Sequence, residues 1–221
     1  MKLDSPNRIG QSRCLYDHRG HPLSATSAAG QPPRITIVTP SFNQAEFLEE
    51  CLDSVLSQGY PNLEYIVMDG GSTDGSVDII KKYERHLAYW QTGPDGGQYP
   101  AIQAGLNRGT GDIMAWLNSD DRYWPDTLKT VADAFAGHDA VRWLTGRGIA
   151  IDADGQITVV QHLRSLTQED YLDPERISYL QQESTFWRRD LWQEAGAHID
   201  TSLKLAGDRS EERRVGKECR S

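Results

Sequence analysis

Short apolar segments alternate with segments of helical period along this chain, and that alternation constrains the fold more than any other feature. The apolar segments are rich in Val, Ile and Leu, as is typical of strands buried on both faces. We expect strands at residues 34–42, 63–69, 87–93, 111–121 and 140–152, and helices at 43–58, 76–86, 101–109 and 125–137. Strands that alternate with helices imply right-handed crossovers, so we expect an α/β fold with a mostly parallel central sheet flanked by helices.

Local signals mark the ends of several of these elements. Asn43 is a suitable N-cap for the helix that follows it, and Pro125 suits the first turn of the helix that it begins. The turn-forming sequence DADG at residues 152–155 predicts that residues 156–160 return as the second strand of a hairpin.

Length, charge and cysteine content limit the class of protein. The chain has 221 residues, of which 38% are hydrophobic, so it fits one globular domain with a full core. The formal net charge of −9 disfavours a nucleic-acid partner and favours a site for a metal ion or a metal-bound phosphate. The cysteines Cys14, Cys51 and Cys219 have no disulfide or metal-binding spacing, so we expect a reducing, cytoplasmic compartment. No apolar run is long enough to span a membrane, and the N-terminus lacks the apolar core of a signal peptide.

The two ends of the chain differ from the rest. Residues 1–33 are rich in Gly, Pro, Ser and Arg without periodicity, which predicts a poorly ordered extension. Residues 209–221, RSEERRVGKECRS, resemble the conceptual translation of a sequencing adapter, so we expect a non-native tail. A charged, solvated C-terminal helix is the alternative for this tail. Residues 34–208 remain as the folded domain, which we expect to be incomplete at its C-terminal end.

Polar, acidic or glycine-rich residues follow three of the expected strands. They are Pro40 and Ser41 after the first strand, residues 69–71 after the second, and residues 118–121 after the fourth. In parallel α/β sheets, ligands bind beyond the carboxyl ends of the strands. The sequence therefore predicts a ligand site at this edge of the sheet.

Asp120 and Asp121 are adjacent carboxylates with no basic residue near them before Arg122. A solvated turn or a helix cap would explain them without a ligand. Alternatively they bind a divalent cation such as Mg2+ or Mn2+, which needs few protein carboxylates when nucleotide phosphates complete its shell. Such a cation would also neutralise a leaving phosphate.

The sequence DGGSTDG at residues 69–75 also allows two interpretations. It is rich in turn formers, and Ser72 could cap the helix that follows. Alternatively the glycines admit a ligand close to the backbone, while Asp69 accepts hydrogen bonds from a base or ribose. The chain contains neither GxGxxG nor GxxxxGK[ST], which argues against a dinucleotide-binding fold and a P-loop NTPase.

Taken in order, these motifs resemble glycosyltransferase family 2. The resemblance is carried by TIVTPSFNQAEFLEECLDSVLSQGYPNLEYIVMDGGSTDGS and by GPDGGQYPAIQAGLNRGTGDIMAWLNSDD, and extends over about residues 34–208. It implies the Rossmann-like GT-A fold, a nucleotide-sugar donor, typically a UDP-sugar, a divalent metal, and inverting transfer to a hydroxyl of a saccharide or lipid-linked acceptor. Family habit suggests cell-envelope or exopolysaccharide synthesis at the inner face of the membrane, and leaves peripheral membrane association open.

The resemblance also implies roles for residues on the donor side. Pro40 and Ser41 match the first nucleotide-contact loop, and Asp69, followed by Gly70, matches the Asp that recognises the base. Asp95 lies in the loop that contacts the nucleoside side of the donor.

The metal motif of the family is most often Asp-x-Asp-Asp, whereas this chain has Asn118 at the first position. Asn118 can contact a ribose or phosphate oxygen but adds no charge. Asp120 is therefore the expected direct ligand, with Asp121 as a second or water-mediated ligand. Pro100 is a further departure, because close relatives usually carry Asp there.

Inverting transfer needs a general base that takes the acceptor proton. Leu205-Ala206-Gly207-Asp208 matches the first part of the family segment that carries this carboxylate, so Asp208 is the candidate base, with an ordinary turn Asp as the alternative. Glu183 and Trp187 lie in the segment that resembles the acceptor side of the family, although Trp187 suits a core position equally well.

Two other classes of function compete with a transferase. A sugar-nucleotide binding protein without turnover would share the donor site. A nucleotidyltransferase usually carries a basic, Gly-rich loop after the first strand, but the loop PSFNQAEF at residues 40–47 has no basic residue.

Overall fold

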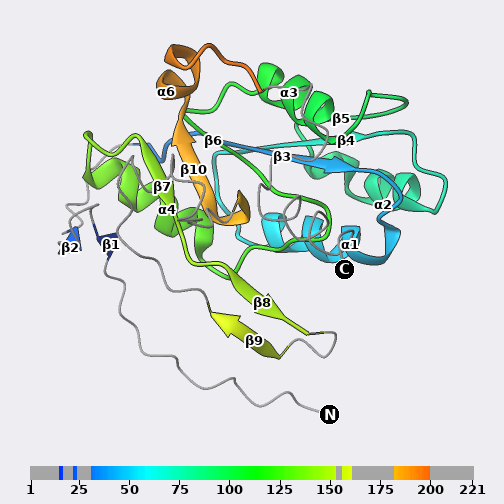
Figure 1. Ribbon diagram of the computed structural model, residues 1–221, viewed down its shortest axis with the longest axis horizontal. Coiled ribbons are helices and arrows are strands. Elements are labelled where there is room, and N and C mark those ends of the chain that lie inside the picture. The colour runs from blue at the N-terminus through cyan, green and yellow to red at the C-terminus, as the bar shows by residue number, and fades with distance from the viewer. Residues whose placement is uncertain (1–14, 17–21, 24–30, 153–155, 161–181, 200–221) are drawn as a thin grey trace, which may run out of the picture.

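Six strands of the computed structural model form one central sheet with helices on both faces (Figure 1). The structure describes residues 15–16, 22–23, 31–152, 156–160 and 182–199. The strands of this sheet are β3 (Ile35–Ser41), β4 (Leu63–Asp69), β5 (Tyr89–Thr92), β6 (Ile113–Trp116), β7 (Trp143–Thr145) and β10 (Thr185–Arg188). The helices are α1 (Ala45–Leu56), α2 (Ser76–Tyr83), α3 (Gln98–Arg108), α4 (Thr127–Gly137) and α6 (Arg189–Glu194), with 3-10 turns η1 (Glu84–His86) and η2 (Gln182–Ser184). Within these residues, none of the helices combines the length and apolarity that a membrane crossing requires.

The central sheet has the order β5-β4-β3-β6-β10-β7 and is mostly parallel, as the sequence predicts. Strands β5, β4, β3 and β6 run parallel to one another. Strand β10 is antiparallel to both of its neighbours and lies between β6 and β7, although the sequence pattern indicates no strand there. The C-terminal part of the chain therefore extends the sheet rather than only packing against it.

Strand β6 is shorter than predicted, because it ends at Trp116 rather than at residue 121. Leu117 N donates to Val38 O, and the next bond of this ladder would need an N–H from Pro40. Proline has no N–H, so the pairing of β3 with β6 stops at this point. The Asn118–Asp121 segment is released from the sheet as a loop at the rim.

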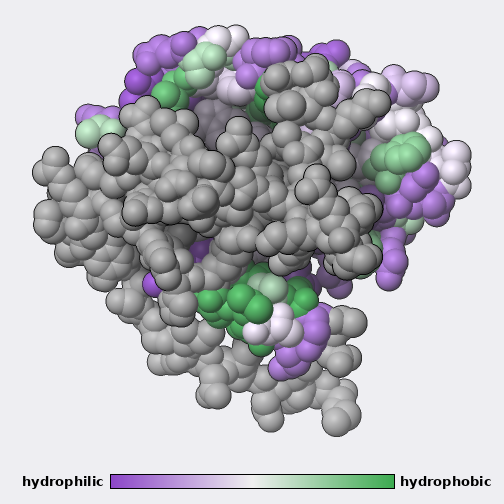
Figure 2. Space-filling view, viewed as in Figure 1, coloured by the Kyte–Doolittle hydropathy of each residue, from purple (hydrophilic) through white to green (hydrophobic). Residues whose placement is uncertain are grey.

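The predicted strand at residues 140–152 is two strands. Its first part is β7 of the central sheet, and its second part is β8 (Ile149–Ile151), which pairs antiparallel with β9 (Ile157–Val160). The predicted hairpin is thus confirmed, although it lies outside the main sheet. Figure 2 shows the apolar surface of this hairpin on the lower part of the molecule. A separate pair, β1 (Leu15–Tyr16) and β2 (Pro22–Leu23), falls within the predicted N-terminal extension.

The sheet separates two hydrophobic clusters. On one face α1, α2 and α4 cover residues such as Ile37 and Val67, and on the other face α3 and α6 cover Val38 and Ile66. Successive residues of β3 and β4 thus point to opposite faces, and all but the partly buried Leu63 are buried, which explains why both sequences are mostly apolar and lack alternation.

Helix α1 begins at Ala45 and not at Asn43, so the predicted Asn43 cap is wrong. Asn43 has a positive φ of 53°, and its side-chain Oδ1 accepts a hydrogen bond from Thr73 N. Asp74 Oδ2 instead accepts from Ala45 N at 2.8 Å. The turn that ends β4 therefore caps the first helix, which fixes the two rim loops against each other.

At the opposite end of the sheet, the carboxylate of Glu64 joins three segments of chain. It is 6% exposed and accepts hydrogen bonds from Thr36 Oγ1, Thr110 N and Thr110 Oγ1. Arg34 approaches it at 3.2 Å. Burial raises the pKa of Glu64, but the hydrogen bonds and Arg34 together outweigh it and leave the pKa below its ordinary value of 4.5. The folded state therefore favours the ionised form.

Glu64→Ala should lower the free energy of unfolding by about 2–4 kcal/mol at pH 7, because it leaves buried hydroxyl and amide donors without their acceptor. Since the folded pKa is lowered, the contribution of Glu64 is complete above the unfolded pKa and is lost as pH falls through the folded pKa. Urea unfolding at pH 7 and at pH 3 should therefore show a larger difference from wild type at pH 7. Glu49→Ala is the control, because Glu49 is half-exposed and pairs with Lys82 only at the surface. Equal effects of the two variants would contradict the structural role of Glu64.

Candidate donor and metal site

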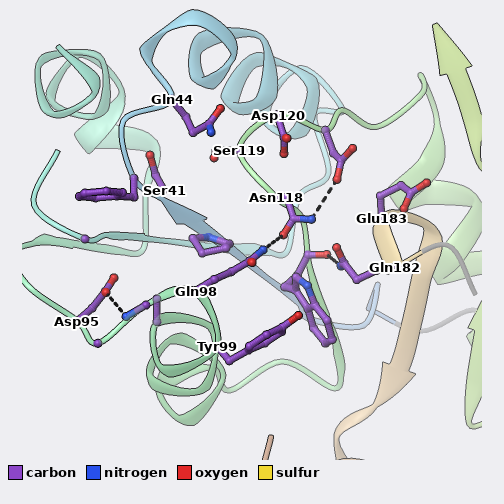
Figure 3. Close-up of a pocket in the computed structure, with 18 of the residues that line it drawn as sticks. Ser41, Gln44, Asp95, Gln98, Tyr99, Asn118, Ser119, Asp120, Gln182 and Glu183 are labelled. Carbon is purple, nitrogen blue, oxygen red and sulfur yellow. Dashed lines mark hydrogen bonds between the residues drawn. The ribbon is translucent and has the colours of Figure 1, made fainter. Parts of the chain in front are cut away.

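The carboxyl ends of β3, β4 and β6 open onto one cavity of about 760 Å3, at the edge where the sequence predicts the ligand site (Figure 3). Its walls come from within residues 40–44, 94–101 and 116–121, together with Gly70 and the pair at 182–183. Pro40, Ser41, Gly70 and Asp95 are thus brought together with the Asn118–Asp121 loop.

Two polar atoms in the wall of this cavity have no hydrogen-bond partner among the described residues. Ser41 Oγ is one of them, on a residue that is 4% exposed. The other is Gln182 Oε1, while Nε2 of the same side chain donates to Trp116 O. An unpaired buried polar atom costs about 1–3 kcal/mol, so both positions favour a ligand that supplies hydrogen bonds.

Asn118 orients the loop that carries the acid pair. Its Oδ1 accepts from Gln98 Nε2 at 2.8 Å, and its Nδ2 donates to Asp121 Oδ2 at 3.3 Å (Figure 3). Its backbone oxygen accepts from Cys51 Sγ at 3.4 Å. The amide that replaces a carboxylate at this position therefore holds Asp121 in place, while Asp120 is exposed to solvent.

The cavity is acidic. Its described lining includes Asp95, Asp120, Asp121 and Glu183, and no Lys, Arg or His. A diphosphate placed here would meet carboxylates without a compensating positive side chain from these residues, which is unfavourable unless a cation is bound with it.

Over the described part of the chain, no group of three or more His, Cys, Asp and Glu side chains is arranged to hold a metal. The available donor set, Asp120 and Asp121, instead fits a hard cation that takes one or two protein carboxylates and completes its shell with phosphate oxygens and water. These residues thus fit Mg2+ or Mn2+ bound together with a nucleotide, and do not fit an all-protein metal cage.

Asp69 does not line the cavity. It is fully buried, and its Oδ2 accepts from Gly71 N, Ser72 N and Thr92 Oγ1, while Oδ1 accepts from Ser72 Oγ. These four bonds account for about the whole accepting capacity of a carboxylate. In this geometry Asp69 shapes the turn beneath the cavity, and its contact with the base stays a prediction. Ser72 likewise bonds Asp69 rather than capping α2.

Asp95 and Phe42 converge over Gly70. A Cβ added at Gly70 would lie 3.2 Å from Asp95 Oδ2 and 3.2 Å from the Phe42 ring. Asp95 Oδ1 accepts from Gly97 N at 2.8 Å, which leaves Oδ2 directed to the open side of Gly70. Phe42 is 60% exposed. This end of the cavity offers a flat aromatic face and one carboxylate oxygen.

Glu183 and Trp187 have different surroundings, although the sequence places both on the acceptor side. Glu183 lines the cavity at the end away from Asp95 (Figure 3). Trp187 lies in β10 and is 8% exposed, with its ring 5.4 Å from that of Trp116 and 6.2 Å from that of Trp192. Trp187 therefore packs in the core, as the alternative interpretation expects, and its acceptor contact stays a prediction. Asp208, the candidate base, lies outside the described residues.

The structure places three residues at the site that the sequence does not predict to belong to it. Gln98 and Gln182 lie in segments that carry other candidates, but an isolated Gln has no distinctive pattern. Cys51 lies within α1, where the sequence gives it no distinctive pattern. Burial raises the pKa of its thiol to about 12, so the thiol stays neutral and donates to the Asn118 carbonyl. Only the tertiary contact between α1 and the Asn118 loop reveals it.

A curated relative gives the first comparison. The chain is 31% identical, over 146 residues, to a putative teichuronic acid biosynthesis glycosyltransferase, TuaG, of Bacillus subtilis. The match covers 63% of this chain and 57% of the relative, so the chain spans little more than half of that protein's length.

Two solved structures share the fold. A mannosyltransferase of Pyrobaculum calidifontis in complex with GDP-Man and Mn2+ aligns with a TM-score of 0.60 and 21% identity, over 85% of this chain and 54% of the other. S. aureus TarS, in complex with UDP-GlcNAc, aligns with a TM-score of 0.59 and 22% identity, over 80% of this chain and 51% of the other. These likenesses show the GT-A fold, in which a mostly parallel sheet is flanked by helices.

The sequence model of the family described as glycosyl transferase family 2 matches residues 36–198, most of the chain and all of the described site. With the strand-end motifs in one cavity and the fold shared with the two solved structures, this chain belongs to glycosyltransferase family 2.

Proposed function

We propose that this protein transfers a sugar from a nucleotide-diphosphate donor, a UDP-sugar, to an acceptor hydroxyl with inversion, in a reaction that depends on a divalent metal. The observation that carries the proposal is the acidic cavity, whose described lining has four carboxylates and no basic side chain. A diphosphate binds there only with a cation, and the Pyrobaculum mannosyltransferase is a neighbour that holds both GDP-Man and Mn2+.

In this proposal, Asp120 and Asp121 hold Mg2+ or Mn2+ beside the donor. The bound cation supplies charge neutralisation to the leaving diphosphate. Asn118 keeps Asp121 turned toward the cavity, and Ser41 supplies an unpaired hydroxyl to the donor. Asp208 is the proposed general base that accepts the proton of the acceptor hydroxyl.

The base of the nucleotide is proposed to stack on Phe42, with its ring N–H donating to Asp95 Oδ2. Gly70 leaves the space between these two groups open. Uracil, thymine and guanine carry a ring N–H that a carboxylate accepts, whereas cytosine and adenine present an acceptor nitrogen at that edge. The TarS complex with UDP-GlcNAc supports uracil among these bases.

Asp95→Asn should weaken UDP binding by about tenfold or more, because it exchanges a charged acceptor for a neutral amide but retains an oxygen for Gly97 N. Calorimetry with UDP, GDP, dTDP, CDP and ADP in the presence of Mn2+ measures the effect. The wild type should prefer the bases with a ring N–H, and the variant should lose most of that preference. Asp139→Asn, on the exposed segment after α4, is the control. An unchanged preference in Asp95→Asn would remove Asp95 from base recognition.

The role in the cell is proposed from the relatives. The named role of TuaG in teichuronic acid biosynthesis supports synthesis of a cell-envelope or exopolysaccharide, with a saccharide or lipid-linked acceptor. A cytoplasmic protein working at the inner face of the membrane is consistent with this role.

A transfer assay tests the proposal as a whole. UDP-, GDP- and dTDP-sugars are incubated with Mn2+ and the chain, both as it stands and with residues 209–221 replaced by the genomic continuation. Release of nucleotide diphosphate is the expected result. If both proteins bind UDP with Mn2+ but neither releases it from any donor, the alternative of a nucleotide-sugar binding protein without turnover replaces the enzyme.

A further inference from the structure

Two hydrogen bonds in series lead from the start of helix α3 to the proposed metal ligand Asp121. Gln98 Nε2 donates to Asn118 Oδ1 at 2.8 Å, and Asn118 Nδ2 donates to Asp121 Oδ2 at 3.3 Å (Figure 3). All three side chains line the donor cavity. We propose that Gln98 is a positioning residue of this site, which fixes the Asn118 amide in the orientation that holds Asp121; the inference rests on the proposed metal-dependent function.

The direction of the two bonds is set by Asp121. An ionised carboxylate accepts hydrogen bonds but cannot donate them, so the end of the Asn118 amide that faces Asp121 must be the NH2 group. The oxygen of the same amide then faces Gln98 and needs a donor, which Gln98 Nε2 supplies. The reverse orientation would bring Asn118 Oδ1 against Asp121, where two acceptors would repel each other.

The amide of Asn118 depends on its partners for its orientation. The oxygen and NH2 ends of an amide have nearly the same shape, so only their hydrogen bonds distinguish them. In Asn118 one partner donates and the other accepts, and both favour the same orientation. Removing Gln98 therefore weakens the preference that keeps Asn118 Nδ2 on Asp121.

Gln98 projects from a firmly held part of the chain. It is the first residue of α3 and follows Gly97, whose φ of 115° and ψ of −179° form a conformation essentially restricted to glycine. Gly97 N also donates to Asp95 Oδ1 at 2.8 Å. Further along α3, Gly105 packs so closely on β3 that an added Cβ would clash with Val38. A side chain held by such an element can orient another group precisely.

The backbone of Asn118 is held without Gln98. Asp121 N and Cys51 Sγ both donate to the Asn118 carbonyl oxygen. Gln98 itself is exposed, so its replacement removes little buried surface. Loss of the Gln98 side chain should therefore release the Asn118 amide and leave the fold intact, which allows a positioning role to be separated from a structural one.

Gln98→Leu tests the inference, because it keeps the length of the side chain and removes the donor. The affinity for Mn2+ in the presence of UDP, measured by electron paramagnetic resonance of free Mn2+, should fall about threefold to tenfold, the range expected for loss of one hydrogen bond. Gln98→Ala should give a similar loss. The melting temperature of both variants should equal that of the wild type.

Gln103→Leu is the matched control. Gln103 lies on the same helix and forms the same kind of bond, from its Nε2 to Asn107 Oδ1 at 2.8 Å, but it is not part of the cavity lining. Its replacement should leave the affinity for Mn2+ unchanged.

A double-mutant cycle shows whether Gln98 acts through Asn118. In an Asn118→Ala background, Gln98→Leu should change the affinity for Mn2+ by less than about twofold, because the amide that Gln98 orients is absent. NMR of the metal-free proteins gives a second measurement. The side-chain NH2 protons of Asn118 should exchange with solvent faster in Gln98→Leu than in the wild type, and at the wild-type rate in Gln103→Leu.

Equal affinities for Mn2+ in Gln98→Leu and wild type would overturn the inference, as would an equal loss with and without the Asn118 amide. If the wild type does not bind UDP with Mn2+, the proposed function fails instead. The NMR comparison needs neither metal nor nucleotide, so it tests the orientation of Asn118 in either case, and unchanged exchange in Gln98→Leu would exclude the role of Gln98.

Discussion

Asp120→Ala should lower the affinity for UDP in the presence of Mn2+ by at least about 100-fold, because the variant loses the exposed carboxylate that is the proposed direct metal ligand. With EDTA in place of Mn2+, the effect of Asp120→Ala on UDP affinity should have the opposite sign. The cavity then presents carboxylates without a cation, so removing one of them reduces the repulsion of the diphosphate. The metal-free variant should bind UDP as well as the metal-free wild type, or better.

Calorimetric titrations of UDP with Mn2+ and with EDTA measure both parts of this prediction. Asp78→Ala is the matched control, because Asp78 lies exposed on α2, where it forms an ion pair with Lys81. The same titrations with Asp121→Ala show whether Asp121 contributes to metal binding as much as Asp120 does, or less. Binding that is unchanged in Asp120→Ala with Mn2+ would exclude Asp120 from the metal site.

Asp208→Asn should lower turnover by about 100-fold to 10,000-fold and leave UDP affinity unchanged, because a general base acts on the acceptor proton and not on the donor. The carboxylate must be ionised to accept the proton, so the rate of the wild type should fall toward low pH. The variant should lack this acidic limb. Its pH–rate profile is therefore as informative as its rate.

The measurement for Asp208 is kcat/KM against pH for wild type and variant, beside the UDP affinity of each. Asp190→Asn is the control, because Asp190 lies exposed on α6 and pairs with Arg142. A variant with near-normal turnover and an unchanged profile would show that another group takes the proton, and Glu183 in the wall of the cavity would then be the next candidate.

Local sequence was sufficient to predict the parallel part of the sheet. Strands β3 and β4 are mostly apolar, because helices cover both faces, and the polar residues at their ends mark the rim. The cavity at Pro40, Ser41 and the Asn118–Asp121 loop follows from this topology.

The features that local sequence does not predict depend on contacts between residues that are far apart along the chain. Strand β10 is short, and its neighbours β6 and β7 lie far away along the chain, so nothing local distinguishes it from a helix start. The end of β6 depends on Pro40, a residue of another strand. The packing of Trp187 on Trp116 is likewise visible only in three dimensions.

Local sequence also cannot decide the role of a single side chain, and Asp69 is an example. Its position after a buried strand is equally compatible with binding a base and with tying a turn. In the structure Gly71, Ser72 and Thr92 donate to Asp69 and tie the turn, and Thr92 lies in the neighbouring strand β5. Asp95 Oδ2, which faces Gly70, is a further carboxylate oxygen at this edge.

The insertion of β10 between β6 and β7 also orders events during synthesis. Among the described strands, β7 pairs only with β10, and Thr145 and Thr185 are 40 residues apart. At about 5–20 residues per second, the ribosome needs roughly 2–8 s to add those residues. The parallel strands can associate on the emerging chain, while the β7 segment waits without a neighbour. In this intermediate the edge of β6 that later pairs with β10 is exposed, so chaperones could bind it. The wall of the cavity is completed only when Gln182 and Glu183 have been synthesised.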